Sequence, residues 1–220
     1  MKEALSFDDV LLVPQYSDIY SRKEIKIKQN LRNVGDFNLP IIASPMDTIT
    51  ESRMSRAMSK AGGTSVIHRY NTIEEQTSIV RDVVSYGSTV GAAIGVGDDF
   101  LERAVSLANV GVGFLCIDVA HGHHLKVRTA LKALRDVFSD SIHIMAGNVA
   151  TLEAFNDLSD WGADSIRIGI GGGSICSTRV QTGHGMPTLQ SIMDCAKSDR
   201  DTALIADGGI RTSGDIVKAL

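Results

Sequence analysis

The sequence predicts an α/β fold, a (β/α)8 TIM barrel of which about seven of the eight βα units are present in this chain. Short apolar runs alternate with longer amphipathic segments at a spacing of roughly 25–35 residues, which is typical of repeated βα units. The apolar runs are nearly continuous, as in parallel strands covered on both faces. The chain has 220 residues, of which 43% are hydrophobic, so it can bury a large core in one domain.

The seven predicted strands lie at residues 40–44, 64–68, 90–94, 114–118, 142–146, 165–168 and 203–206. Helical patterns lie at residues 50–61, 72–84, 100–109, 125–138, 152–161 and 212–220. Several helices begin with a capping residue. Thr72, for example, is followed three residues later by Glu75, which is the pattern of a capping box.

A closed barrel needs eight strands, and the last predicted helix reaches Leu220. We therefore expect residues 1–220 to form a single barrel domain that is incomplete at its C-terminus. An open doubly wound sheet, which tolerates any number of strands, is the alternative. The barrel is favoured because candidate functional residues follow most of the strands, whereas in an open sheet they would gather at one switch point.

Composition excludes several classes of protein. A formal charge of -4 gives no electrostatic reason to bind nucleic acid. No run approaches the ~18 apolar residues of a membrane helix, and the first residues lack a signal-peptide pattern. The three cysteines, Cys116, Cys176 and Cys195, are too few and too widely spaced for a disulfide framework or a structural zinc site. We expect a reducing, cytoplasmic setting.

The sixth strand runs into the most informative loop, residues 169–176, with the sequence GIGGGSIC. Glycines allow several backbone N–H groups to point at one anion, and Cys176 follows directly. Neighbouring N–H groups and Arg179 could stabilise its thiolate, which can add to an electrophilic ring carbon. The loop is not a dinucleotide fingerprint, because Ser174 replaces the third glycine and residues 178–187 are polar and not helical in pattern. The alternative is a flexible turn with a chance cysteine.

Other polar residues follow the remaining strands, and in a barrel they converge on the C-terminal mouth. A carboxylate such as Asp207 can accept both hydroxyls of a ribose, and the two glycines after it leave N–H groups for a phosphate. The alternative for this motif is a capped turn before the helix at Thr212. His121, His123 and His124 suggest a metal only weakly, because no carboxylate lies at ligand spacing. Cys116 and Cys195 are expected to pack as small apolar groups.

These motifs resemble the IMP dehydrogenase/GMP reductase family over nearly the whole chain. The matching stretches, in order, are residues 6–14, 44–48, 62–68, 146–149, 169–179 and 206–209. The resemblance implies a barrel, tetrameric when complete, that acts in purine metabolism on a nucleoside monophosphate (GMP, IMP or XMP). It implies that Cys176 is the nucleophile at purine C2 and that Thr178 is the catalytic residue beside it.

The resemblance also implies three further sets of site residues. The positions that match substrate-binding residues are Ser44, Met46, Asn148, Arg167, Gly173, Ser174, Asp207, Gly208 and Gly209. The positions that match the NADP or NAD site are Asp118, Ala120 and His121. The carbonyl groups of Gly171, Gly173 and Cys176 match part of a potassium site.

The family contains two activities, and the resemblance favours the reductase, which converts GMP and NADPH to IMP and ammonia. The short segment between His68 and Val90 leaves no room for the regulatory CBS pair of most dehydrogenases, and Thr182-Gly183 follows the reductase pattern. The alternative is the dehydrogenase, which converts IMP and NAD to XMP. It is supported by residues 44–51, 62–68 and 120–123 and by Arg69, which stands where the reductase has a lysine. A third possibility, of another class, is a non-catalytic remnant that binds nucleotide.

Overall fold

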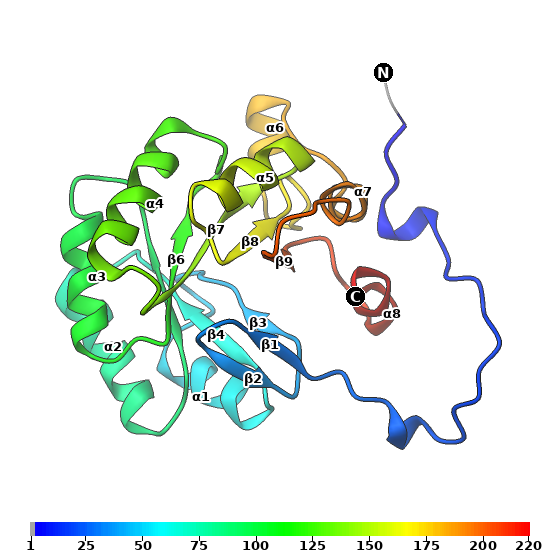
Figure 1. Ribbon diagram of the computed structural model, residues 1–220, viewed down its shortest axis with the longest axis horizontal. Coiled ribbons are helices and arrows are strands. Elements are labelled where there is room, and N and C mark those ends of the chain that lie inside the picture. Colours follow the sequence, from blue (N-terminus) through cyan, green and yellow to red (C-terminus); the bar gives the residue numbers. More distant parts are fainter. Residues whose placement is uncertain (1–2) are drawn as a thin grey trace.

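The computed structural model describes residues 3–220 and shows a curled sheet of seven parallel strands with helices on its outer face (Figure 1). Each strand pairs with the next one in the sequence, in the order β3-β4-β5-β6-β7-β8-β9. The predicted βα-barrel architecture with seven strands is confirmed. The strands are β3 (Ile42–Ala43), β4 (Thr64–Ile67), β5 (Gly91–Ile94), β6 (Phe114–Asp118), β7 (His143–Val149), β8 (Ser165–Ile168) and β9 (Ala203–Ala206).

All six predicted helices are present, with ends that differ by a few residues at most. They are α1 (Ser52–Lys60), α2 (Ile73–Ser85), α3 (Phe100–Asn109), α4 (Leu125–Phe138), α5 (Leu152–Asp160) and α8 (Ser213–Ala219). The predicted capping box at α2 is confirmed: Thr72 Oγ1 accepts from Glu75 N at 3.1 Å, and Glu75 Oε2 accepts from Thr72 N at 2.9 Å. Reciprocal capping satisfies two backbone donors that the first turn leaves without partners.

Two apolar clusters lie on opposite faces of the sheet. The larger fills the layer between the strands and the surrounding helices and includes Leu115, Ile117 and Ile144. The smaller lies on the concave face and consists of Val66, Ala93, Phe114, Cys116 and Met145. Strand residues alternate between the two faces, so a strand buried on both sides is apolar almost throughout. This is why the sequence reveals these strands so clearly.

Five elements differ from the sequence prediction. A hairpin of β1 (Gln29–Leu31) and β2 (Gly35–Phe37) precedes the barrel, and its short, largely polar strands carry no visible alternation. Residues 178–187, expected to lack a helix, contain the five-residue α6 (Thr178–Thr182), which ends at Gly183 with φ 71°. Helix α7 (Thr188–Cys195) follows. Strand β7 extends past residue 146, so Asn148 lies within the strand and not after it.

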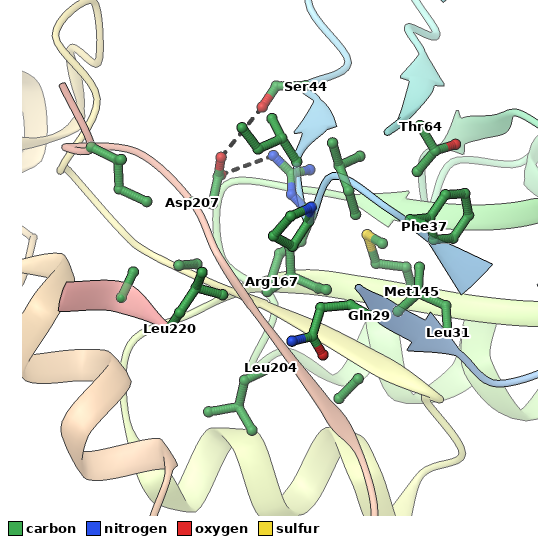
Figure 2. Close-up of a pocket in the computed structure, with 18 of the residues that line it drawn as sticks. Gln29, Leu31, Phe37, Ser44, Thr64, Met145, Arg167, Leu204, Asp207 and Leu220 are labelled. Carbon is green, nitrogen blue, oxygen red and sulfur yellow. Dashed lines mark hydrogen bonds and ion pairs between the residues drawn. The ribbon is translucent and has the colours of Figure 1, made fainter. Parts of the chain in front are cut away.

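The sheet has two edge strands, β3 and β9, which are separated by a cavity of about 690 Å³. The hairpin lines one end of this cavity and the barrel mouth lies at the other, where Ser44 and Asp207 meet (Figure 2). Ser44 Oγ donates to Asp207 Oδ1 at 3.4 Å. The ends of the two edge strands are thus joined at the mouth even though the strands themselves do not pair.

Candidate functional site

The centre of the mouth is a buried network around Arg167, which projects from β8 (Figure 2). Its Nη1 donates to Asp118 Oδ1 at 2.6 Å, and its Nη2 donates to Asp207 Oδ2 at 2.8 Å. Asp118 ends β6 and Asp207 follows β9, so one guanidinium connects strands on both sides of β8. The sequence places these carboxylates at the mouth but gives no sign that they share a cation.

Asn148 strengthens the same network from β7. Its Nδ2 donates to Asp207 Oδ2 at 2.6 Å and to the carbonyl of Gly169 at 2.9 Å. The neighbouring Gly147 leaves the space that Arg167 needs, because a Cβ atom at Gly147 would lie 2.7 Å from Arg167 Cβ. The side-chain oxygen of Asn148 is buried and has no partner in the described part of the chain.

Burial and charge fix the protonation states of this network. Burial lowers the pKa of Arg167, but its interactions with the acidic groups Cys116, Asp207 and Asp118 in their ionised forms outweigh burial and raise it overall. Burial raises the pKa of the Cys116 thiol to about 12, so this thiol is neutral at pH 7. The two carboxylates therefore provide the charge that stabilises the guanidinium at neutral pH, and the group of three carries a net negative charge.

The glycine loop and the Asp207 turn pack directly against each other, backbone to backbone. Gly169 has φ 147°, and a Cβ atom there would lie 1.9 Å from the carbonyl oxygen of Asp207. A Cβ atom at Gly208 would lie 3.0 Å from Gly173 N. Within residues 3–220, the N–H groups of Gly172, Gly173 and Ser174 make no hydrogen bond to the protein. The two motifs thus form one glycine-lined surface with donors free to bind an anion.

Cys176 lies at the end of this loop and is partly exposed. Its pKa is lowered chiefly by a hydrogen bond from the Thr178 side chain, then by the backbone N–H of Thr178, and further by the Gly171 N–H and the charge of Arg179, while slight desolvation opposes these effects. These donors stabilise the thiolate, the reactive form of the side chain. By contrast, burial raises the pKa of Cys195 to about 11.

Two residues near the site were missed or undervalued by sequence reasoning. Thr188, at the start of α7, is 4% exposed, and its hydroxyl has no hydrogen-bond partner among the described residues. That oxygen lies 2.3 Å from where a Cβ of Gly172 would be, directly beneath the glycine loop. No local pattern marks this threonine, because it lies outside the predicted helices. Arg69 Nε donates to the carbonyl of Asp118 at 3.3 Å.

The remaining predicted residues lie on neighbouring loops. Met46 forms a turn after β3, where its carbonyl accepts from Ile49 N and Thr50 N at 3.0 Å each. Ala120 and His121 are exposed and are separated from Asp118 by Val119. His123 Nε2 lies 2.7 Å from Asp157 Oδ2, and His124 caps α4 by accepting from Lys126 N at 3.0 Å. No cluster of three or more His, Cys, Asp or Glu suited to a metal ion occurs in residues 3–220.

Comparison with known proteins agrees with these motifs. A family model described as "IMP dehydrogenase / GMP reductase domain" matches residues 4–220. An inosine-5'-monophosphate dehydrogenase of Nitrosopumilus maritimus is 31% identical over 345 aligned positions, which cover 100% of this chain and 72% of that protein. No helix in residues 3–220 is long and apolar enough to cross a membrane.

Solved structures with both family names superpose closely. An inosine 5' monophosphate dehydrogenase from Legionella pneumophila matches with a TM-score of 0.91 and 45% identity, covering 99% of this chain and 66% of that one. A GMP reductase from Trypanosoma brucei matches with a TM-score of 0.94 and 27% identity, covering 100% of this chain and 80% of that one. The chain thus spans about two thirds to four fifths of the length of these relatives.

Proposed function

The chain belongs to the IMP dehydrogenase/GMP reductase family, and we propose that its barrel mouth performs covalent redox chemistry on a purine nucleoside monophosphate. The relatives that it matches are named for oxidoreductase activities of this kind. The proposal depends above all on Cys176, a partly exposed thiol whose pKa is lowered by Thr178 and Gly171. Thiolates at such sites are effective nucleophiles.

The glycine-lined surface supports the placement of the substrate. The free N–H groups of Gly172, Gly173 and Ser174 suit a phosphate, with Gly208 and Gly209 packed beside them. Asp207 Oδ1, whose contact with Ser44 is long at 3.4 Å, can accept from the ribose hydroxyls. Anchoring at these points would bring the base towards Cys176, whose thiolate adds to C2 while Thr178 stabilises the charged sulfur.

Asp118 suits the cofactor side of the site. Its Oδ1 is held by Arg167, while Oδ2 has no protein partner within residues 3–220 and can accept from a ribose hydroxyl of NAD or NADP. The bound nicotinamide supplies the hydride chemistry at C2. The carbonyls of Gly171, Gly173 and Cys176 are the proposed potassium ligands. The Gly173 carbonyl already accepts from Cys176 N at 3.2 Å, which leaves its second lone pair for an ion.

We favour the dehydrogenase reaction, IMP and NAD to XMP, over the reductase reaction that the sequence motifs favour. Arg69 donates to the Asp118 carbonyl, and a guanidinium is poorly suited to protonate a departing amine because it hardly gives up a proton. The 45% identity to the Legionella pneumophila dehydrogenase agrees with this choice. GMP reduction stays the second candidate because Thr182-Gly183 follows the reductase pattern and because α2 is the only element between β4 and β5.

The absence of a regulatory insertion is also part of the proposal. The alignment with the Nitrosopumilus maritimus protein extends over 345 positions, more than the 220 residues of this chain, so that relative contains residues that have no counterpart here. We propose that residues 1–220 contribute one barrel domain, with no CBS pair between β4 and β5.

The test is to incubate the purified protein with IMP plus NAD and, separately, with GMP plus NADPH, and to follow absorbance at about 340 nm, where reduced nicotinamide absorbs. A rise in the first mixture supports the dehydrogenase. A fall in the second mixture alone supports the reductase. If neither mixture changes but IMP and GMP bind, the chain is a nucleotide-binding remnant and the catalytic proposal is wrong.

A further inference from the structure

We propose that Arg167 is a shared positioning residue whose single guanidinium orients both ribose-binding carboxylates, Asp207 on the nucleotide side and Asp118 on the cofactor side. This inference rests on the proposed function, since it assigns one ligand to each carboxylate. It differs from direct binding of the substrate, the role that family resemblance implies for Arg167. The guanidinium nitrogens of Arg167 and one oxygen of each carboxylate are already paired with each other within the protein.

Both terminal nitrogens of the guanidinium donate hydrogen bonds to protein carboxylates. Nη1 donates to Asp118 at 2.6 Å and Nη2 to Asp207 at 2.8 Å. The Arg167 side chain is 9% exposed, whereas those of Asp118 and Asp207 are 20% and 24% exposed. The carboxylates therefore reach the mouth, and the arginine supports them from beneath without facing a ligand itself.

Each carboxylate uses one oxygen to bind Arg167 and keeps the other for the mouth. Asp207 Oδ2 accepts from both Arg167 and Asn148, while its Oδ1 has only the long contact with Ser44. Asp118 Oδ1 accepts from Arg167, and Oδ2 has no protein donor in the described part of the chain. Fixing one oxygen of a carboxylate fixes the direction of the other. Arg167 thereby sets the orientation of two acceptors for two different ligands.

Charge explains why one planar cation suits this position. Two carboxylates close together repel each other, and a cation between them removes that repulsion. A guanidinium presents parallel donors in a rigid plane, so it can hold both carboxylates at once, whereas an ammonium is a point charge on a flexible stem. Replacing Arg167 by lysine should keep the charge but lose the simultaneous hold on both sides.

The test is to titrate IMP and NAD separately into the purified protein by calorimetry and to compare Arg167→Lys with the parent. Because each ligand depends on a carboxylate that Arg167 orients, we expect the Kd for both ligands to rise about tenfold. The matched controls are Asp207→Asn, which should weaken IMP alone, and Asp118→Asn, which should weaken NAD alone. Arg200→Lys, on the far side of the barrel, should leave both values within about twofold.

A second variant perturbs the arginine without changing its charge or its partners. In Gly147→Ala the new Cβ lies 2.7 Å from Arg167 Cβ and must displace it, so both Kd values should rise by a few fold. This variant also serves if Arg167→Lys does not fold. Binding is measured only on protein whose melting profile shows that it is folded, so that lost stability is not mistaken for lost affinity.

The possible results are distinct. Weakening of both ligands in Arg167→Lys or Gly147→Ala supports the shared role. Weakening of only one ligand overturns it, because Arg167 would then serve that ligand alone. No weakening of either also overturns it and leaves Arg167 a structural residue. If the parent binds neither IMP nor GMP, the proposed function itself fails, which is a different result from any obtained with a functional parent.

Discussion

The Arg167 network and the Cys176 loop meet at the same mouth but are built in opposite ways. The network is buried, and its charges are paired by side chains from several strands. The loop is open to solvent: Ile175 is 76% exposed, and the thiol is stabilised mainly by its immediate neighbours in the sequence. We infer that the buried network orients the ligands and that the exposed loop supplies the reactive thiol of Cys176.

The three cysteines show the same contrast within one residue type. Burial raises the pKa of Cys116 to about 12 and of Cys195 to about 11, so both are neutral thiols at pH 7. Cys176 has its pKa lowered because hydrogen bonds from Thr178 and Gly171 favour the thiolate. Environment therefore decides which cysteine is a nucleophile.

The largest expected effect is the loss of the nucleophile. Cys176→Ala should lower turnover by roughly four orders of magnitude or more, because no other group can form the bond to C2. The Kd for the nucleotide should stay within about threefold, since the phosphate and ribose contacts remain. Absorbance assays and calorimetry measure the two quantities. If the variant turns over as fast as the parent, Cys176 is not the nucleophile.

Substitutions in the Arg167 network should lower the stability of the fold, whereas substitutions in the Cys176 loop should lower the rate of turnover. Arg167→Met leaves the largely buried Asp118 and Asp207, which are 20% and 24% exposed, without their cation, so the free energy of unfolding should fall by about 3–5 kcal/mol. Arg200→Met removes an equally well-formed but solvent-exposed ion pair and should change stability little. Urea denaturation measures the free energy of unfolding of both variants and of the parent. Equal losses in both variants would mean that burial does not distinguish the two arginines.

Two glycines, one in the network and one at the end of α6, should differ in how much stability their replacement costs. Gly147→Ala forces a Cβ against Arg167 in the network and should cost about 1–3 kcal/mol of stability. Gly183→Ala, at the end of α6, has open space around its Cβ but a φ of 71°, so it should cost only about 1 kcal/mol. Thermal or urea unfolding of both variants checks the order. A reversed order would mean that the backbone conformation at Gly183 costs more stability than the crowding at Gly147.

The smallest expected effect is a shift in thiol ionisation. The side chain of Thr178 is the largest cause of the lowered Cys176 pKa, so Thr178→Val should raise that pKa and move alkylation by iodoacetamide to higher pH. In the native parent, Cys176 should react near neutral pH while Cys116 and Cys195 stay unlabelled. Peptide mass spectrometry follows each site. If the pH dependence of Cys176 alkylation is unchanged in the variant, Thr178 does not lower the pKa of Cys176.

Sequence patterns predicted local structure and the meeting of motifs, but not the pairing of charges. The strands at residues 114–118 and 165–168 were predicted with their observed ends. The first is apolar up to Asp118 because it is buried on both faces, whereas the second carries Ser165 and Arg167 at buried positions. The glycine loop and the Asp207 turn meet as expected, because strand ends converge in a barrel. The Arg167–Asp118 pair joins residues 49 positions apart, and no local pattern encodes such a contact.

The residues that escaped prediction share this dependence on tertiary packing. Thr188 lies outside the predicted helices, and only the position of Gly172 above it reveals an unpaired buried hydroxyl. The β1–β2 hairpin consists of three-residue strands, which are too short for alternation to show. Strand β7 extends to Val149 because it continues to pair with β8, and Asn148 is the unpaired residue at a register shift between Gly147 and Val149.

The most direct measurement is a crystal structure of the protein with IMP bound. The account predicts the purine C2 within about 3.5 Å of Cys176 Sγ, a near-attack distance, with the phosphate against Gly172–Ser174 and the ribose on Asp207. A purine bound elsewhere, or a Cys176 sulfur directed away from the base, would contradict it.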